Sequence, residues 1–183
     1  MYSKHWTEAI DQNTQDFQRA FGKLTPKELN WKPASDRWSI AQCIDHIMVI
    51  NQTYFPVVQA LREGTYQAPW HGRFSFLCRF FGNLVLQSVQ PTQTRKTKTF
   101  PIWEPGQSEL PGDILARFAK HQGDLKKMIQ SSEELVARRA VISSPANRTI
   151  VYHLGMAFEI IVAHEKRHFN QAWEVLNLQK EAK

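Results

Sequence analysis

The stretch that decides the fold runs from Thr149 to Leu178 and reads TIVYHLGMAFEIIVAHEKRHFNQAWEVLNL. Apolar residues recur in it every three to four positions, which is the period of a helix with one buried face. The residues of this buried row are Ile150, Leu154, Ala157, Ile161, His164, His168, Ala172 and Val175. Two histidines take places where apolar side chains are expected. The pattern therefore predicts a long helix whose imidazoles point into the core.

Three other segments carry the same period. We expect helices over about Ser3 to Gly22, Ser39 to Leu61 and Pro111 to Gln130. Ser39 and the Gln three positions later form a capping box, and Pro56 should kink the second helix or end it early. We find no internal repeat and no credible strand pairing. Helices separated by turns predict an all-α protein, a four-helix bundle with a long central crossover.

The crossover covers residues 64–110 and contains an apolar stretch at 74–86. A connection of this length is usually functional. Two interpretations stay open: a lid over a site, or a crossover with an extra helix that packs on the core or on a second subunit. The apolar stretch also leaves a homodimer open, because such a surface is rarely left in water.

The bulk composition fits one domain over residues 1–183, with 64–110 as an insertion. No apolar run reaches the length of a membrane span, and the N-terminus lacks the apolar stretch of a signal peptide. We therefore expect a cytoplasmic protein with no membrane partner. The net charge of +6 permits nucleic-acid binding, but no nucleic-acid-binding motif accompanies it, so nucleic acid is not an expected partner. Cys43 and Cys78 are too few for a disulfide framework, and Cys43 should be a buried, inert thiol.

His164 and His168 lie four residues apart and so share one face of their helix. Burying both imidazoles in the charged form would be costly, whereas a shared divalent metal uses both as neutral ligands. A catalytic metal site usually has three protein ligands and an open position. A third ligand must therefore come from another histidine or from a nearby carboxylate.

The sequence offers five other histidines for that place. His153 is on the same helix face but about 16 Å from His164 along the axis, which is too far to share an ion. His121 sits among polar neighbours, and His5 and His71 have the surroundings of surface residues. His46 lies at the interior edge of the second helix and is the best third ligand.

The spelling His164-Glu165-Lys166-Arg167-His168 also matches the zinc motif of many metalloproteases, in which the glutamate activates the metal-bound water. Neither the downstream third ligand nor an upstream strand that could hold a peptide is evident, so a zinc metalloprotease is a remote alternative. Glu165 is the candidate catalytic base or a support of the metal ligands, and a solvent-facing helix residue is the competing interpretation. Asn13 and Asp45 are weaker candidates to assist the metal ligands.

Three motifs in order are LTPKELNWKP at 24–33, WSIAQCIDHI at 38–47 and HEKRHFNQ at 164–171. Together they resemble the DinB/YfiT-like superfamily of helical-bundle metalloenzymes, which is unrelated to the DNA polymerase of similar name. The resemblance spans most of the chain. It implies a divalent ion, zinc or nickel, held by one histidine of the second helix and two of the fourth. Those positions are His46, His164 and His168.

The resemblance also implies a class of reaction, because members include S-transferases and isomerases that use low-molecular-weight thiols. We expect a metal-dependent transferase or hydrolase that acts on a small electrophilic molecule. Arg73, Arg79 and Arg95 are candidates to attract an anionic thiol, although a solvated basic surface explains them as well. Two other hypotheses stay open: a non-catalytic metal- or ligand-binding module of a stress response, and a structural bundle whose histidines only form hydrogen bonds.

Overall fold

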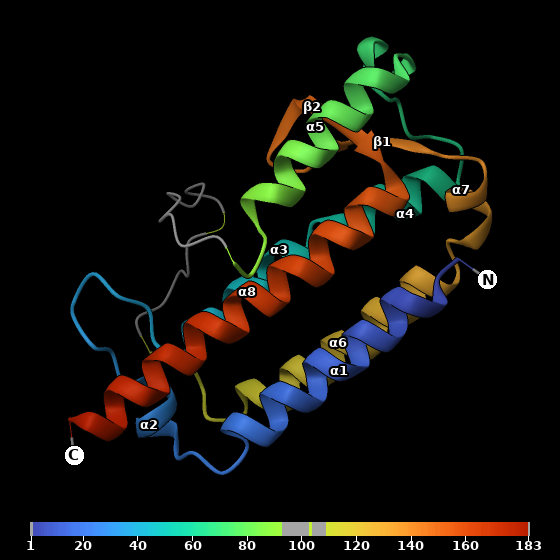
Figure 1. The fold of residues 1–183 in the computed structure, drawn as a ribbon. Coiled ribbons are helices and arrows are strands. Elements are labelled where there is room, and N and C mark those ends of the chain that lie inside the picture. The colour runs from blue at the N-terminus through green and yellow to red at the C-terminus, as the bar shows by residue number, and fades with distance from the viewer. Residues whose placement is uncertain (1, 93–102, 104–108, 183) are drawn as a thin grey trace.

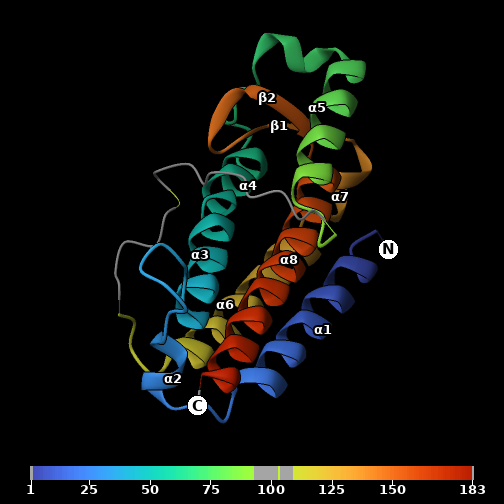
Figure 2. The same ribbon diagram turned by 60° about the vertical axis from the view of Figure 1, so that its left-hand side comes forward.

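The computed structural model describes residues 2–92, 103 and 109–182. Its frame is a bundle of long helices that run side by side, with α8 between α1 and α3 and with α6 behind them (Figures 1 and 2). The bounds of these helices are α1 Lys4–Phe21, α3 Ile40–Gln52, α6 Ile114–Gln130 and α8 Leu154–Glu181. The expected all-α bundle is thus confirmed. None of the described helices is both long and apolar enough to cross a membrane.

The second expected helix is present but broken. It ends as α3 at Gln52 and continues as α4, Tyr54–Arg62. Pro56 is the third residue of α4, where a backbone N–H has no partner within the helix, so the proline is tolerated there and not inside a continuous helix. At the other end, Ser39 caps α3 by accepting a hydrogen bond from the Gln42 backbone N–H, and the Gln42 side-chain oxygen accepts one from the Ser39 backbone N–H. A similar capping box at Thr25 starts the short helix α2, Pro26–Asn30.

Two expectations are wrong: that the fourth helix begins at about Thr149, and that the chain has no strand pairing. Residues from Val141 onward form an antiparallel hairpin, with β1 at Val141–Ser144 and β2 at Asn147–His153, and α8 begins only at Leu154. The short helix α7, Glu133–Ala137, precedes the hairpin. Thr149 to His153 are β-branched or aromatic residues that favour a strand. The four-residue spacing of Ile150 and Leu154 also fits a helix, so the helical period extended too far upstream.

The described part of the crossover contains a 3-10 turn, η1 Trp70–Arg73, and a helix, α5 Ser75–Ser88. Helix α5 lies against β2 and the first part of α8 (Figure 1). Its C-terminal end is held by Arg167, whose Nη1 donates to the Ser88 carbonyl over 2.9 Å. The extra helix packed on the core, one of the two interpretations of this segment, is therefore present. Residues 93–102 and 104–108, to which the lid interpretation also applied, lie outside the described residues.

The core consists of two apolar clusters, one at each end of the bundle. The cluster near the hairpin is built around Trp6, Tyr54, Leu125 and Phe158. The cluster at the opposite end is built around residues of all four long helices: Phe17, Phe21, Ile44, Phe118 and Val175. On α1, α6 and α8, polar side chains lie between the two clusters, at Asn13, Gln122 and His164, and they are part of the candidate site.

Candidate metal centre

Three imidazoles converge inside the bundle. His46 comes from α3, and His164 and His168 come from successive turns of α8. They are 2%, 8% and 6% exposed, and one ring nitrogen of each lies within 4.8 Å of the others. Among the described residues, this is the group of histidine, cysteine and acidic side chains able to hold a metal ion. The three histidines singled out in the sequence thus lie together in the structure.

The two α8 imidazoles face each other through their Nε2 atoms, which lie 3.0 Å apart. Two nitrogens bound to one tetrahedral zinc, each about 2.0–2.1 Å from the metal, would be separated by roughly 3.3 Å. A small rotation of the rings would therefore suffice to admit an ion. Without a metal, only one of the two facing nitrogens can carry a proton, because two N–H groups would repel each other.

The third imidazole is oriented by the crossover. Nδ1 of His46 donates a hydrogen bond to the backbone carbonyl of Trp103 over 2.7 Å. A carbonyl oxygen only accepts, so Nδ1 carries the proton and the neutral ring keeps a lone pair on Nε2. A hydrogen bond of this kind on the far nitrogen is the usual support of a metal-bound histidine. Trp38 lies beside the three imidazoles. Its ring centroid is 4.7 Å from that of His46 and 5.9 Å from that of His168, on which it stacks.

Burial keeps all three imidazoles neutral. It lowers the pKa of His46 to about 4 against the opposing hydrogen bond to Trp103. Burial also holds the pKa values of His164 and His168 well below the usual range, and the other imidazoles of the cluster add to the effect. Neutral imidazole is the form that binds a divalent metal, so the donor set fits zinc or nickel at neutral pH.

Glu165 is fully buried, at 0% exposure, and the solvent-facing interpretation is wrong. Its Oε1 accepts a hydrogen bond from Nδ2 of Asn51 over 2.8 Å. Its Oε2 accepts from Nδ2 of Asn13 over 3.1 Å and from Nε2 of Gln122 over 2.9 Å. The three amides belong to α3, α1 and α6, so this carboxylate joins α8 to every other long helix. Burial raises the pKa of Glu165 to about 7, against the three amide donors that lower it.

The sequence indicated only some of the residues that form hydrogen bonds with Glu165 and His46. Asn13 was a weaker candidate to assist the metal ligands, and Gln122 was not singled out. Asn51 and Trp103 were missed. A signal existed for Asn51, because it lies on the side of α3 that faces the bundle, but no local pattern marks a residue whose backbone carbonyl supports a distant histidine.

The remaining histidines do not join the cluster. His121 is half-buried beside Phe55, with ring centroids 5.8 Å apart. His153 bonds to the Arg139 carbonyl, and His5 bonds to Glu159. His71 is half-buried and bonds to the carbonyl of Thr149 in β2, so it is not the free surface residue that was expected.

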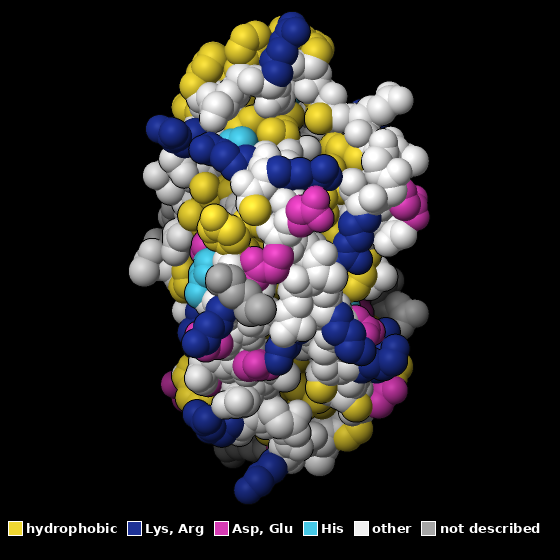
Figure 3. All heavy atoms as spheres, turned by 90° about the vertical axis from the view of Figure 1, so that its right-hand side faces the viewer, with side chains coloured by type: hydrophobic (Ala, Val, Ile, Leu, Met, Phe, Trp, Pro, Cys, Tyr) yellow, Lys and Arg dark blue, Asp and Glu magenta, His cyan; other side chains and the backbone are white. Residues whose placement is uncertain are grey.

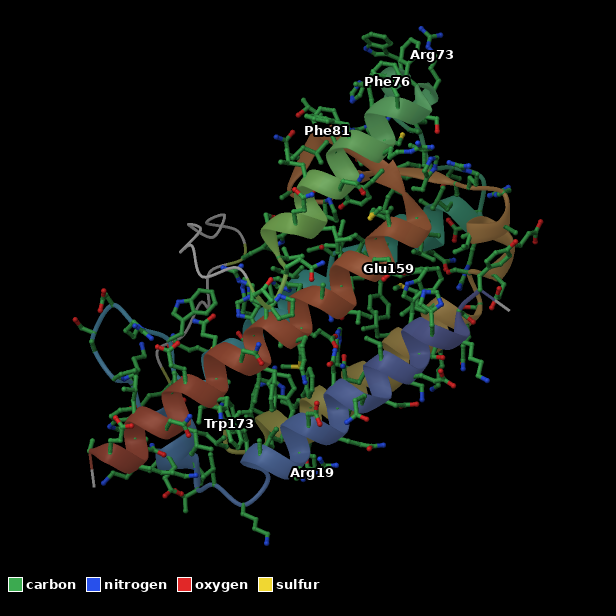
Figure 4. The ribbon with its side chains drawn as sticks, in the orientation of Figure 1. Arg19, Arg73, Phe76, Phe81, Glu159 and Trp173 are labelled. Carbon is green, nitrogen blue, oxygen red and sulfur yellow. The ribbon has the colours of Figure 1, made fainter. Side chains whose placement is uncertain are left out.

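The other candidate residues, which are Asp45, the arginines and the cysteines, are not part of the three-histidine group. Asp45 is half-buried in α3, and burial raises its pKa. Arg73 ends η1 and projects beside the start of α5 (Figure 4), Arg79 is exposed on α5, and Arg95 lies outside the described residues. Both cysteines are free and buried, and burial raises the pKa of the Cys43 thiol, consistent with an inert side chain.

Comparison with known proteins gives one result. A family model described as the DinB superfamily matches residues 9–172, which include most of α1, all of α3 and α6, and both histidines of α8. No curated protein and no solved structure matches the chain. The matched region contains all three converging imidazoles.

Proposed function

Because the chain belongs to the DinB superfamily, we propose that it is a metal-dependent enzyme whose divalent ion, zinc or nickel, is held by His46, His164 and His168. One observation carries the proposal: three neutral imidazoles meet at one buried point, within 4.8 Å of one another. A purely structural role would require each ring to find its own hydrogen-bond partner. Nδ1 of His164 is buried without one among the described residues, and its Nε2 faces that of His168.

Three protein ligands leave at least one position open on the ion. When bound there, the metal would act as a Lewis acid that lowers the pKa of a coordinated water or thiol toward neutrality. The chain's own residues prepare the site. Trp103 keeps the His46 proton on Nδ1, and the Trp38 indole shields His46 and His168 from water. The substrate class we propose is a small electrophile, with water or a low-molecular-weight thiol as the nucleophile.

We propose that Glu165 positions α8 rather than serving as the general base. Both of its oxygens already accept hydrogen bonds from amides on three other helices. A base must reach the proton that it removes, within about 3 Å or through one water, and this carboxylate is fully buried. The same contacts weigh against the metalloprotease reading of the His-Glu-x-x-His spelling, in which the glutamate must activate the metal-bound water.

Elemental analysis of protein purified without an affinity tag tests the proposal. We expect close to one equivalent of zinc or nickel per chain. Alanine at His46, His164 or His168 should lower metal affinity by about 100-fold or more, since two imidazoles bind a divalent ion weakly. His121→Ala and His153→Ala are matched controls outside the cluster and should leave the affinity unchanged. A protein with no stoichiometric metal and no effect of His46→Ala would contradict the metal site.

Turnover requires a separate measurement. Metal-loaded protein would be assayed with glutathione, bacillithiol or mycothiol against halogenated aromatics and epoxides, and with ester substrates for hydrolysis. We expect activity that disappears in His164→Ala. Activity that survives this substitution would exclude the metal mechanism. Stoichiometric metal without any turnover would favour the non-catalytic binding module.

A further inference from the structure

A row of large apolar side chains is exposed along the crossover helix. Among the described residues, seven large apolar side chains are exposed, and five of them belong to η1, α5 or the residue between them. These five, which we term the α5 face, are 38% to 71% exposed: Trp70, Phe74, Phe76, Phe80 and Leu84. Phe76, Phe80 and Leu84 follow each other at four-residue intervals and so form one stripe of the helix.

The opposite side of α5 fixes the helix to the molecule. Cys78 and Gly82 are buried there, and the Cys78 thiol bonds to the Gly72 carbonyl over 3.2 Å. A Cβ added at Gly82 would lie 2.7 Å from Met156 Cγ, so helix and core are in close contact. The α5 face is therefore not needed to pack α5, and its exposure has to be explained by something else.

Along the sequence, the charged residues of the segment that contains η1 and α5 have one sign. The sequence contains no Asp or Glu between Glu63 and Glu104, and its charged residues there are Arg73, Arg79, Arg95, Lys96 and Lys98. The hairpin against which α5 packs lies in a second such stretch, between Glu134 and Glu159, with Arg138, Arg139 and Arg148. The Arg73 guanidinium lies 5.5 Å from the Trp70 ring and 5.4 Å from the Phe74 ring.

The figures show this end of the molecule directly. Arg73 of η1 and Phe76 of α5 project at the end of the molecule where α5 extends beyond the bundle (Figure 4). At the upper end of the space-filling view, hydrophobic and Lys or Arg side chains are exposed together, while acidic side chains are found farther down (Figure 3).

From this juxtaposition we infer that the α5 face binds an anionic lipid surface. Aromatic and leucine side chains on one side of a helix, with arginines beside them, have the composition of a helix that lies in the plane of a membrane interface. The apolar side chains enter the boundary between headgroups and acyl chains, and the arginines pair with anionic headgroups. Helix α5 has 14 residues and would be about 21 Å long, enough to lie on a membrane. The expectation of no membrane partner rested on the lack of a spanning segment, and a helix that lies on the membrane surface is compatible with that finding.

Charge favours a lipid surface over a second copy of the chain. A symmetric dimer places the same patch on both subunits, so Arg73 and Arg79 of one copy would meet those of the other. No acidic residue lies in this part of the sequence to balance them. An anionic membrane satisfies both the apolar and the basic part of the surface.

The test is co-sedimentation of the full-length protein with vesicles. Vesicles of phosphatidylcholine with roughly one-third phosphatidylglycerol should bind the protein, vesicles of phosphatidylcholine alone should bind it far more weakly, and added NaCl should reduce binding. The double variant Phe76→Ser/Phe80→Ser should lose binding to both. Arg73→Glu/Arg79→Glu should weaken binding to the anionic vesicles by about twentyfold or more, at about fivefold per basic residue.

Two controls keep the result interpretable. Trp173→Ser removes another exposed aromatic side chain, which lies on α8 far from the α5 face (Figure 4), and should bind vesicles like the parent protein. Circular dichroism and metal content of every variant check that the bundle is intact. Three results would overturn the inference: no vesicle binding, a monomer–dimer equilibrium that is abolished by Phe76→Ser/Phe80→Ser while vesicles are not bound, or binding of single-stranded nucleic acid in preference to vesicles.

Discussion

Nδ1 of His46 donates a 2.7 Å hydrogen bond to the backbone carbonyl of Trp103, a residue 57 positions later in the chain. The crossover therefore returns to the centre of the bundle and contacts the imidazole cluster. This single contact decides which nitrogen of His46 is free, and it links the position of the crossover to the state of the metal centre. A substitution that displaces the Trp103 carbonyl should therefore change the metal affinity of the imidazole cluster.

Trp103→Ala tests this link. The Trp103 side chain is partly buried and packs on the cluster near the hairpin, and that packing holds its carbonyl in place. We expect the affinity for zinc or nickel to fall by about tenfold, the lower end of the effect of losing a support of a metal-bound histidine. Competition with a chromogenic chelator measures the affinity. Trp70→Ala, an exposed tryptophan of the same crossover, should not change it, and equal effects of the two variants would contradict the link.

A second prediction concerns the carboxylate that joins the four helices. Glu165→Leu would leave three buried amide donors, on Asn13, Asn51 and Gln122, without their acceptor. Each unsatisfied buried donor costs about 1–3 kcal/mol, so the free energy of unfolding should fall by at least about 3 kcal/mol. Urea unfolding monitored by circular dichroism gives this value.

Glu165→Gln is the matched variant and should cost much less, about 1 kcal/mol. Its amide oxygen can accept from two of the donors, and its NH2 group can meet Asn51 once that amide turns over. Oδ1 of Asn51 has no partner among the described residues and would become the acceptor. A Gln variant as unstable as the Leu variant would show that the three amide donors require the carboxylate itself.

The sequence predicts helix faces well and contacts between distant segments poorly. His164 and His168 were placed in the core, and His46 at its edge, because helical periodicity is a local property that any one helix displays. The burial of Glu165 cannot be predicted from the sequence of α8 alone. The residue is buried because amide side chains of α1, α3 and α6 contact its carboxylate, and these contacts come from distant segments. Trp103 contributes a backbone carbonyl, which no side-chain pattern can reveal.

The missed hairpin has a different cause. Ile142 and Tyr152 are paired strand residues buried under α5, yet Thr149 to His153 precede a helix without a proline or glycine between them. In such a run the apolar spacing fits a strand and a helix equally. The pairing with Val141 to Ser144 resolves the ambiguity, and this is a contact that a single segment does not encode.

His121 should make stability depend on pH. Burial lowers the pKa of His121 to about 4, below the 6.5 of a free imidazole, so the unfolded chain takes up a proton before the folded one does. The contribution of the neutral His121 to the free energy of unfolding is therefore fully present above pH 6.5, and it is lost as the pH falls from 6.5 toward 4. At pH 5 the loss should be about 1–2 kcal/mol.

His121→Leu isolates this contribution from that of the three clustered histidines. Between pH 7 and pH 5 the variant should lose less of its free energy of unfolding than the parent, by about the same 1–2 kcal/mol. Urea titrations at both pH values, with the metal removed, measure the difference. Parallel losses in the two proteins would show that His121 is not held neutral in the folded state.

The last prediction uses two glycines that differ in what surrounds them. Gly82 lies where α5 meets the core, and a Cβ there would be 2.7 Å from Met156 Cγ and 3.2 Å from Tyr152 Cβ. Gly82→Ala should therefore destabilise the protein by about 1–2 kcal/mol, as the Met156 side chain can give way only in part. Gly123 lies inside α6 with nothing within 4 Å of its added Cβ. Gly123→Ala should stabilise the protein by about 0.5–1 kcal/mol, because alanine is the better helix former and restricts the unfolded chain. Thermal unfolding of both variants tests the pair, and a stabilising Gly82→Ala would mean that α5 does not pack against α8 as closely as described.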